Sequence, residues 1–350
     1  MRTLNLGIVA HVDAGKTTLT ERLLYAAGVI DEIGSVDDGS TQTDSLALER
    51  QRGITIKSAV ASFVIGDATV NLIDTPGHPD FIAEVERVLG VLDGAVLVIS
   101  AVEGVQPQTR ILMRALQRLR VPSLMFVNKI DRRGAGDERV LRAISERLTP
   151  AIFAMGSTRE LGTRAADFTP WDGADAAALT TLNEELAAQT RSARVHPVFF
   201  GSAITGAGVE ALMGALAELL PAAAGDADGP VSGTVFKIER GPAGEKIAYL
   251  RMFSGTVRTR DRVPFGGFDR FAEGKVTAIR VFDGGAAEPR MSVPAGQIGK
   301  LWGLSEIQVG DAVGSRPEHS EHRVFAPPTM ESVVAAVDPD DRARLRVALG

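Results

Sequence analysis

The fold is decided by residues 4–22, which read LNLGIVAHVDAGKTTLTER. Leu4–Ala10 is a mostly apolar run of the length expected for a buried strand. The residues from Thr17 to Ala27 follow with the pattern of a helix. The stretch therefore predicts a strand, a short loop and a helix.

The connecting loop, Ala10–Thr17, fits the phosphate-binding loop, except that alanine stands where the motif has its first glycine. Such a loop needs backbone N–H groups aimed inward, a lysine that meets the β- and γ-phosphate oxygens, and a hydroxyl that holds magnesium. Gly15, Lys16 and Thr17 supply these parts. The loop predicts a nucleoside triphosphate site, but it does not say which base is bound.

The same alternation continues through the first two hundred residues. Further strands are expected at Val70–Ile73, Ala95–Ser100, Ser123–Val127 and Val198–Phe200, and further helices at Pro79–Leu89, Pro107–Leu119, Glu138–Leu148 and Val209–Leu220. This order implies right-handed crossovers and an α/β fold with a doubly wound, mostly parallel sheet. Ligands on such sheets bind at the carboxyl ends of the strands, so the chemistry is expected in the loops that come after them.

Two further segments fit the phosphate side of a nucleotide site. Asp74–His78 reads DTPGH after a buried strand, so Asp74 can hold a magnesium-bound water and Gly77 can bring its N–H close to a γ-phosphate. Arg52–Ile56, RGITI, ends a long polar segment and suits a switch loop. Thr55 would add a second hydroxyl to magnesium when the γ-phosphate is present. The predicted metal ligands are therefore Thr17, Thr55 and Asp74.

The base is indicated by Asn128–Asp131, NKID, which also comes after a strand. The Asp131 carboxylate can accept two hydrogen bonds from guanine, whereas adenine would leave it unpaired. Asn128 would brace the loop and contact guanine N7, and Gly201–Ala203 can add N–H donors toward O6. The ordered set is specific for a GTPase with GTP or GDP and Mg²⁺. The predicted nucleotide contacts are Ala10, His11, Val12, Asp13, Ala14, Gly15, Lys16, Thr17, Thr18, Gly77, Asn128, Lys129, Asp131, Ser202 and Ala203.

The pattern changes after Leu220, where a Pro-, Ala- and Gly-rich stretch has linker composition. Beyond it, short runs punctuated by glycine predict a small antiparallel barrel. A second break falls at Pro327-Pro328, and the residues after it are too few to close a core. We expect a nucleotide-binding domain over 1–222, a linker over 223–230, a β-barrel over 231–322, and the start of an incomplete third domain over 323–350.

Composition sets the remaining limits. The 350 residues are 45% hydrophobic and 23% charged, as in an ordinary soluble protein, and the absence of cysteine excludes disulfides, zinc fingers and thiol nucleophiles. The start of the chain has no signal-peptide pattern, so we expect a cytoplasmic monomer without a membrane span. The net charge of −6 argues against a surface that wraps DNA. Residues 231–320 carry 13 Lys and Arg against 10 Asp and Glu, which a mixed solvated surface explains as well as a basic patch.

These motifs resemble those of the translational GTPases related to elongation factor G. The likeness is closest to the tetracycline-resistance ribosomal protection proteins, and it extends over nearly the whole chain. It is carried by Ala10–Arg22, Gly34–Asp37, Thr43-Asp44, Leu48–Ile56, Asp74–His78, Gln108–Leu112, Asn128–Asp131, Gly201–Ala203 and, in the barrel, residues 295–311. The segment 156–188 looks shortened relative to that family.

The resemblance assigns further roles. His78 would be the catalytic residue that orients the attacking water when the ribosome, with its RNA and proteins, presses it inward. Val12 and Ile54 would form the apolar gate that keeps His78 away until then, and Asp13 is similar to the family's phosphate-loop aspartate. Full members of the family continue beyond the equivalent of residue 350. We therefore expect nucleotide chemistry, but not drug displacement, from this chain alone.

Three interpretations remain open from the sequence. The first is a ribosome-dependent GTPase of the ribosomal protection type, present as its front part. The second is a translocase like elongation factor G. The third is a nucleotide-binding module without productive turnover, which a measurement of GTP hydrolysis with and without ribosomes would distinguish from the other two.

Overall fold

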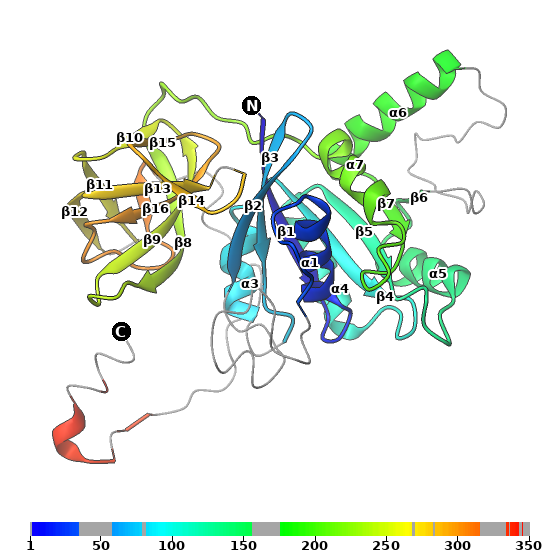
Figure 1. Cartoon of the computed structure of the whole chain (residues 1–350), viewed down its shortest axis with the longest axis horizontal. Coiled ribbons are helices and arrows are strands. Elements are labelled where there is room, and N and C mark those ends of the chain that lie inside the picture. Colours follow the sequence, from blue (N-terminus) through cyan, green and yellow to red (C-terminus); the bar gives the residue numbers. More distant parts are fainter. Residues whose placement is uncertain are drawn as a thin grey trace.

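The computed structural model describes residues 2–34, 58–78, 82–155, 176–267, 270–282 and 284–315, with separate positions between 334 and 345. A first domain built on a mostly parallel sheet is followed by an antiparallel β domain, and the two pack side by side (Figure 1). The predicted segment Arg52–Ile56 lies outside the described residues. So does most of 323–350.

The first sheet has seven strands in the order β2-β3-β1-β4-β5-β7-β6. Their bounds are β1 Arg2–Ala10, β2 Ala59–Ile65, β3 Ala68–Asp74, β4 Gly94–Ser100, β5 Ser123–Asn128, β6 Ile152–Ala154 and β7 His196–Phe200. Every neighbouring pair is parallel except β2 with β3. The predicted doubly wound, mostly parallel architecture is confirmed.

Helices cover both faces of this sheet, as a parallel sheet requires. They are α1 Lys16–Ala26, α3 Ile82–Leu89, α4 Pro107–Arg118, α5 Asp137–Arg147, α6 Ala176–Arg191 and α7 Val209–Leu219. Apolar side chains of α1, α6 and α7 share one core cluster, and those of α3, α4 and α5 share the other. The strands between them are buried on both sides, which explains their continuous apolar runs.

Three elements of the first domain were not predicted. β2 is an antiparallel edge strand joined to β3 by Gly66 and Asp67, with Gly66 at φ +58°. β6 is only three residues long and gives no periodic signal. The helix α6 is rich in alanine, which favours helix without marking an apolar face.

The second domain is built from antiparallel strands. They are β8 Ser232–Arg240, β9 Lys246–Ser254, β10 Thr256–Arg258, β11 Arg262–Gly266, β12 Phe271–Lys275, β13 Ala278–Phe282, β14 Ala287–Arg290, β15 Ser292–Pro294, β16 Ile298–Trp302 and β17 Ala312–Gly314. Eight of them form one sheet in the order β12-β11-β17-β8-β9-β16-β13-β14, and β10 pairs with β15. Their inward side chains form a separate apolar core.

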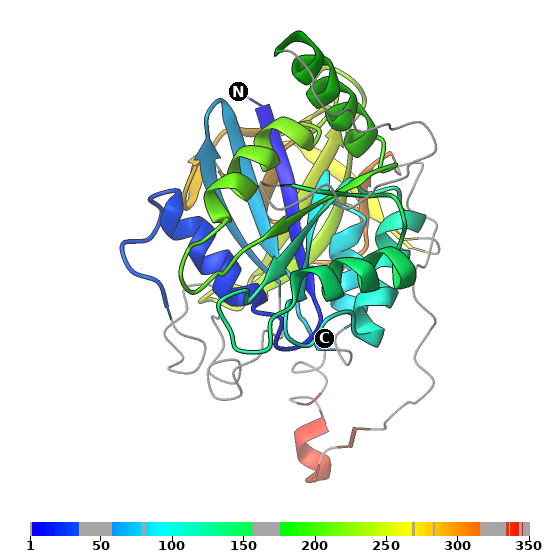
Figure 2. The same cartoon turned by 90° about the vertical axis from the view of Figure 1, so that its right-hand side faces the viewer.

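The two domains share an apolar interface on the side of β3 and α3. Phe236, Tyr249, Phe282 and Ile298 of the second domain pack with Ile73, Val88 and Val91 of the first. Figure 2 is turned by 90° from Figure 1, so that the first domain faces the viewer and the yellow and orange strands of the second domain lie behind it. None of the described helices is long and apolar enough to cross a membrane.

One core residue makes stability depend on pH. His196 of β7 is 2% exposed, and its Nδ1 lies 3.3 Å from the carbonyl oxygen of Ser123. Burial lowers the pKa of His196 from 6.5 to about 4, an effect only partly offset by that carbonyl. The folded protein therefore holds His196 neutral at pH values where the unfolded chain binds a proton.

We expect the free energy of unfolding to fall as pH drops from 6.5 toward 4, because protons bind more tightly to the unfolded state. His196 can lower the free energy of unfolding by at most about 3 kcal/mol, because each unit of pKa difference corresponds to about 1.4 kcal/mol. His196→Leu should reduce the difference between urea unfolding at pH 7 and at pH 5. An unchanged difference would show that His196 is not the titrating group.

Candidate functional site

The loops that carry the motifs meet at the carboxyl edge of the first sheet. β1 ends at Ala10, β3 at Asp74, β5 at Asn128 and β7 at Phe200. Parallel neighbours end at the same edge, so residues far apart in the sequence are brought together there. Val12 is half-buried and Asp13 exposed in the first of these loops, whereas Ile54 and Thr55 lie outside the described residues.

The phosphate-type loop turns directly into α1. Gly15 precedes the helix at φ +88°, a left-handed conformation that favours glycine. A Cβ on Gly15 would lie 2.3 Å from Nδ2 of Asn128. Because the helix begins at Lys16, its first backbone N–H groups face the loop, which is the arrangement that binds phosphate elsewhere.

Lys16 and Asp74 form an ion pair at the start of this helix. Lys16 Nζ lies 2.6 Å from each carboxylate oxygen of Asp74, and the two side chains are 7% and 0% exposed. Lys16 Nζ also lies 3.3 Å from Oγ1 of Thr17, and Thr20 donates to Asp74 at 3.2 Å. The amine, the hydroxyl and the carboxylate that the sequence assigned to phosphate and metal thus lie together.

Asn128 joins three loops through its side-chain amide. Its Nδ2 donates to the carbonyl of Ala14 at 2.8 Å, and its Oδ1 accepts from the N–H of Ala203 at 2.8 Å. Ile130 N–H donates to the carbonyl of Gly201 at 3.2 Å, a second link between the Asn-Lys-x-Asp and Gly-Ser-Ala loops. Ser202 and Ala203 are both buried.

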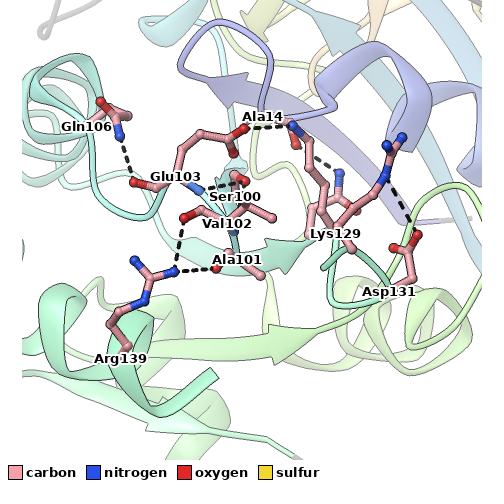
Figure 3. A network of polar contacts seen from close by, with 11 residues as sticks. Ala14, Ser100, Ala101, Val102, Glu103, Gln106, Lys129, Asp131 and Arg139 are labelled. Atoms are coloured by element: carbon pink, nitrogen blue, oxygen red, sulfur yellow. Dashed lines mark hydrogen bonds and ion pairs between the residues drawn. The ribbon is translucent and has the colours of Figure 1, made fainter. Parts of the chain in front are cut away.

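The exposed side of the Asn-Lys-x-Asp loop is shown in Figure 3. Lys129 has φ +69°, and its Nζ lies 3.4 Å from Oε1 of Glu103 in the loop after β4. Asp131 lies 3.9 Å from Nε of Arg132 and is more exposed than Asn128. Arg139 of α5 donates to the carbonyls of the β4 loop and fixes the loop that carries Glu103.

The N-terminus of α4 contacts both phosphate-side motifs, which the sequence reasoning missed. Gln108 donates to the carbonyl of Gly77 at 2.5 Å, and Thr109 Oγ1 lies 3.0 Å from Nδ1 of His11. Gln106 and Thr109 also form a capping box. In the sequence, Gln108 and Thr109 are visible only as two polar residues after Pro107 at the start of a predicted helix. This pattern does not indicate what they contact.

His11 is buried within the phosphate-type loop and is held neutral. Burial lowers its pKa to about 4, with a further lowering from the charge of Lys129 and an opposing effect from Glu103 and Asp13. Its Nε2 has no hydrogen-bond partner among the described residues. Gly77 lies against the backbone of the same loop, because a Cβ there would be 3.6 Å from the carbonyl of Ala10. His78 is the next residue.

The candidate metal ligands are a hydroxyl and a carboxylate. Within the described residues, no group of three or more His, Cys, Asp or Glu side chains could hold a metal ion. Thr17 and Asp74 supply the hard oxygen atoms that Mg²⁺ prefers, and Mg²⁺ in such sites is shared with substrate phosphates. The donor set therefore fits a magnesium–nucleotide complex.

Comparison with known proteins identifies the family. Residues 1–222 match the elongation factor Tu GTP binding domain. The chain belongs to the translational GTPase family. Residues 230–316 of this translational GTPase match elongation factor G domain 2.

The translational GTPase also resembles individual proteins along its whole length. It is 53% identical to the oxytetracycline resistance protein of Streptomyces rimosus and 46% identical to the tetracycline resistance protein TetM of Streptomyces lividans. In both cases 100% of this chain is matched, and it spans 58% of the relative. A crystal structure of a Thermus thermophilus protein superposes on 100% of the chain and 60% of that protein, with a TM-score of 0.79 and 25% identity.

The close contact between Gly15 and Asn128 can be tested by substitution. Gly15→Ala should lower the free energy of unfolding by at least about 2 kcal/mol, because a left-handed residue with a Cβ costs about 1–2 kcal/mol and the methyl group would displace Asn128. Gly214→Ala in α7 is the matched control, since nothing lies within 4 Å of its added Cβ. It should raise stability by about 0.5–1 kcal/mol. Equal effects in urea unfolding would contradict this assignment.

Proposed function

We propose that this translational GTPase binds GTP with Mg²⁺, hydrolyses it when stimulated by the ribosome, and belongs to the tetracycline-resistance type. The observation that carries the proposal is the joining of three motif loops by Asn128 at the sheet edge where Lys16 pairs with Asp74. A ribosome-directed role would place the protein in the cytoplasm.

Base recognition would fall to the Asn-Lys-x-Asp and Gly-Ser-Ala loops. Asp131 would accept from guanine N1–H and the exocyclic amine, and the stem of Lys129 would cover one face of the base. Glu103 and Arg139 support this arrangement, because they hold the neighbouring loop and the Lys129 amine in place. Ser202 and Ala203 would offer backbone N–H groups toward O6.

Phosphate binding would fall to the loop 10–17 and the start of α1. Lys16 would meet the β- and γ-phosphate oxygens, and Thr17, Thr55 and, through water, Asp74 would hold the metal. Magnesium neutralises charge on the transferring phosphate when it is bound. The backbone N–H groups that Gly15 allows to turn inward, together with those of Lys16, Thr17 and Thr18, would stabilise the same charge without rearrangement.

Hydrolysis would be an in-line attack of water on the γ-phosphorus. Gly77 lies against the phosphate-type loop, which supports a position of the adjoining His78 near the γ-phosphate. His78 would orient the attacking water, and Val12 with Ile54 would keep it away until the ribosome moves it. Such a gate makes turnover slow without ribosomes.

The tetracycline-resistance branch is favoured over elongation factor G by the relatives. Three of them, from Streptomyces rimosus, Streptomyces lividans and Clostridium perfringens, are named as oxytetracycline or tetracycline resistance proteins and are 53%, 46% and 39% identical to this chain. Each is matched over at least 99% of the chain. These relatives support membership of the tetracycline-resistance branch. GTP hydrolysis has to be measured directly.

Base selectivity should change in Asp131→Asn. The amide loses an acceptor for guanine and gains a donor for the second carbonyl of xanthine. Hydrogen bonds to charged groups contribute about 1.5–3 kcal/mol, so GTP affinity should fall by roughly ten- to a hundredfold while xanthosine triphosphate binds better. A competition assay against a fluorescent guanine nucleotide measures both. Asp137→Asn, an exposed change at the start of α5, is the matched control. Unchanged selectivity would remove Asp131 from the base site.

Hydrolysis should depend on His78. His78→Ala should bind GTP as the parent does but lose about a hundredfold or more of ribosome-stimulated phosphate release, since positioned proton-transfer and water-orienting groups contribute at least that much. His196→Leu, a buried histidine on the amino side of β7, serves as the control. Equal stimulated rates in His78→Ala and the parent would exclude the role. A parent that binds GTP without any stimulated release would support the non-hydrolysing alternative.

A further inference from the structure

A lysine of the second domain contacts the first domain at the carboxyl edge of the first sheet, where the nucleotide is proposed to bind. Lys237 of β8 donates from Nζ to the carbonyl of Ser58 at 2.6 Å. Lys237 is 8% exposed and Ser58 is 1% exposed, so this charge-assisted bond is shielded from water. Ser58 directly precedes β2, whose first residue, Ala59, pairs with Asp74. The contact therefore lies one residue from the strand end that carries the candidate metal ligand.

Ser58 also connects to α3. Its Oγ donates to Oε1 of Glu84 at 2.7 Å, and its backbone N–H points to the same oxygen at 3.5 Å. Glu84 lies in the first turn of α3, six residues after His78. Ser58 is thus a junction between the start of β2, the helix after the Asp-Thr-Pro-Gly-His motif, and the second domain.

The Lys237 amine is positioned by its own domain. It lies 2.7 Å from Oε1 of Glu239 and 4.9 Å from the centroid of the Tyr249 ring. Tyr249 donates to the other Glu239 oxygen at 2.7 Å, and Lys300 lies 3.9 Å from that oxygen. Burial raises the pKa of Glu239, but the two lysines and the tyrosine outweigh that effect and keep its pKa below the usual value. Contacts within the second domain therefore hold the amine in the position from which it donates to Ser58.

Further polar contacts between the domains lie at the opposite end of the strands. Arg251 pairs with Asp93 at 2.7 Å, and Asp93 precedes β4. Asn5, near the start of β1, donates to the carbonyl of Gly296 at 3.0 Å. These contacts and the apolar cluster hold the domains together at a distance from the motif loops. Lys237, in contrast, contacts the first domain next to the carboxyl end of β3.

We infer that Lys237 is a positioning residue through which the second domain favours the GTP-bound arrangement of the first. The inference rests on the proposed function. Gly77 and His78 precede α3 and are the residues proposed to meet the γ-phosphate side, so fixing α3 and β2 through Ser58 reduces the conformational freedom that GTP binding must remove. GDP lacks the γ-phosphate, so its binding would depend less on Gly77 and His78 and more on the base contacts of Asn128 and Asp131.

The experiment compares nucleotide affinities of Lys237→Met in the whole chain. Fluorescent GDP and a slowly hydrolysed fluorescent GTP analogue are titrated at fixed Mg²⁺. We expect about a tenfold loss of affinity for the GTP analogue, the size of one charge-assisted hydrogen bond, with GDP affinity changed by less than about twofold. Lys246→Met is the matched control, because Lys246 also donates to a backbone carbonyl, that of Ile307, but within the second domain.

A second pair of variants separates positioning from general loss of structure. Lys237→Arg keeps a cation and a donor and should recover part of the GTP affinity. Ser58→Ala keeps the carbonyl that Lys237 contacts but removes the bond to Glu84, and should also weaken GTP more than GDP. If Lys237→Met does not fold, these two variants decide the question.

Each outcome has a distinct meaning. Equal losses for both nucleotides, or no loss for either, would overturn the inference about Lys237. If Lys246→Met also lost affinity for the GTP analogue but not for GDP, the inference would be overturned too. Lys246 has no contact with the first domain among its described hydrogen bonds. A parent protein that binds neither nucleotide would instead refute the proposed function. The two failures are therefore distinguishable.

Discussion

The candidate site depends on one buried amide. Asn128 supplies a donor to Ala14 and an acceptor to Ala203, so each half of the amide is satisfied by the backbone of a different loop. A buried amide that loses a partner costs about 1–3 kcal/mol, so the three loops are stable only in this mutual arrangement. Gly15 is required for the same reason, because a Cβ would occupy the space of the Asn128 side chain. The loops proposed to bind the phosphates and the base are thereby held in a fixed relative position.

The ion pair between Lys16 and Asp74 shows that this edge is not optimised for stability. Both side chains are almost fully buried, and the cost of removing two charges from water can exceed their mutual attraction. Replacing a buried ion pair by apolar residues of similar volume is often neutral or stabilising. The proposed phosphate and metal binding would explain the charges, since the same lysine and carboxylate would then acquire new partners. The neutral His11 beside them has a low pKa for the related reason that burial disfavours its charged form.

The sequence predicted those parts of the fold that local pattern determines. Strands buried on both faces read as unbroken apolar runs, and the motif loops come directly after them, so the sheet and the site edge were predictable. β2 was missed although Ala59–Ile65 is rich in apolar residues. β6 was missed because three residues are too few to show a periodic pattern. The contacts of Gln108 and Lys237 depend on how helices and domains dock. No spacing in the chain encodes such long-range contacts.

The interface between the domains has a division of roles along its length. Apolar side chains in its middle supply non-directional attraction, whereas the Arg251–Asp93 pair at one end and the Lys237–Ser58 bond at the other are directional and fix orientation. Two fixed ends leave little freedom for one domain to rotate on the other. A displacement of Ser58 or α3 must then be taken up by the second domain as a whole. Coupling between two binding sites is reciprocal. A molecule that binds the second domain could therefore also change nucleotide affinity at the first.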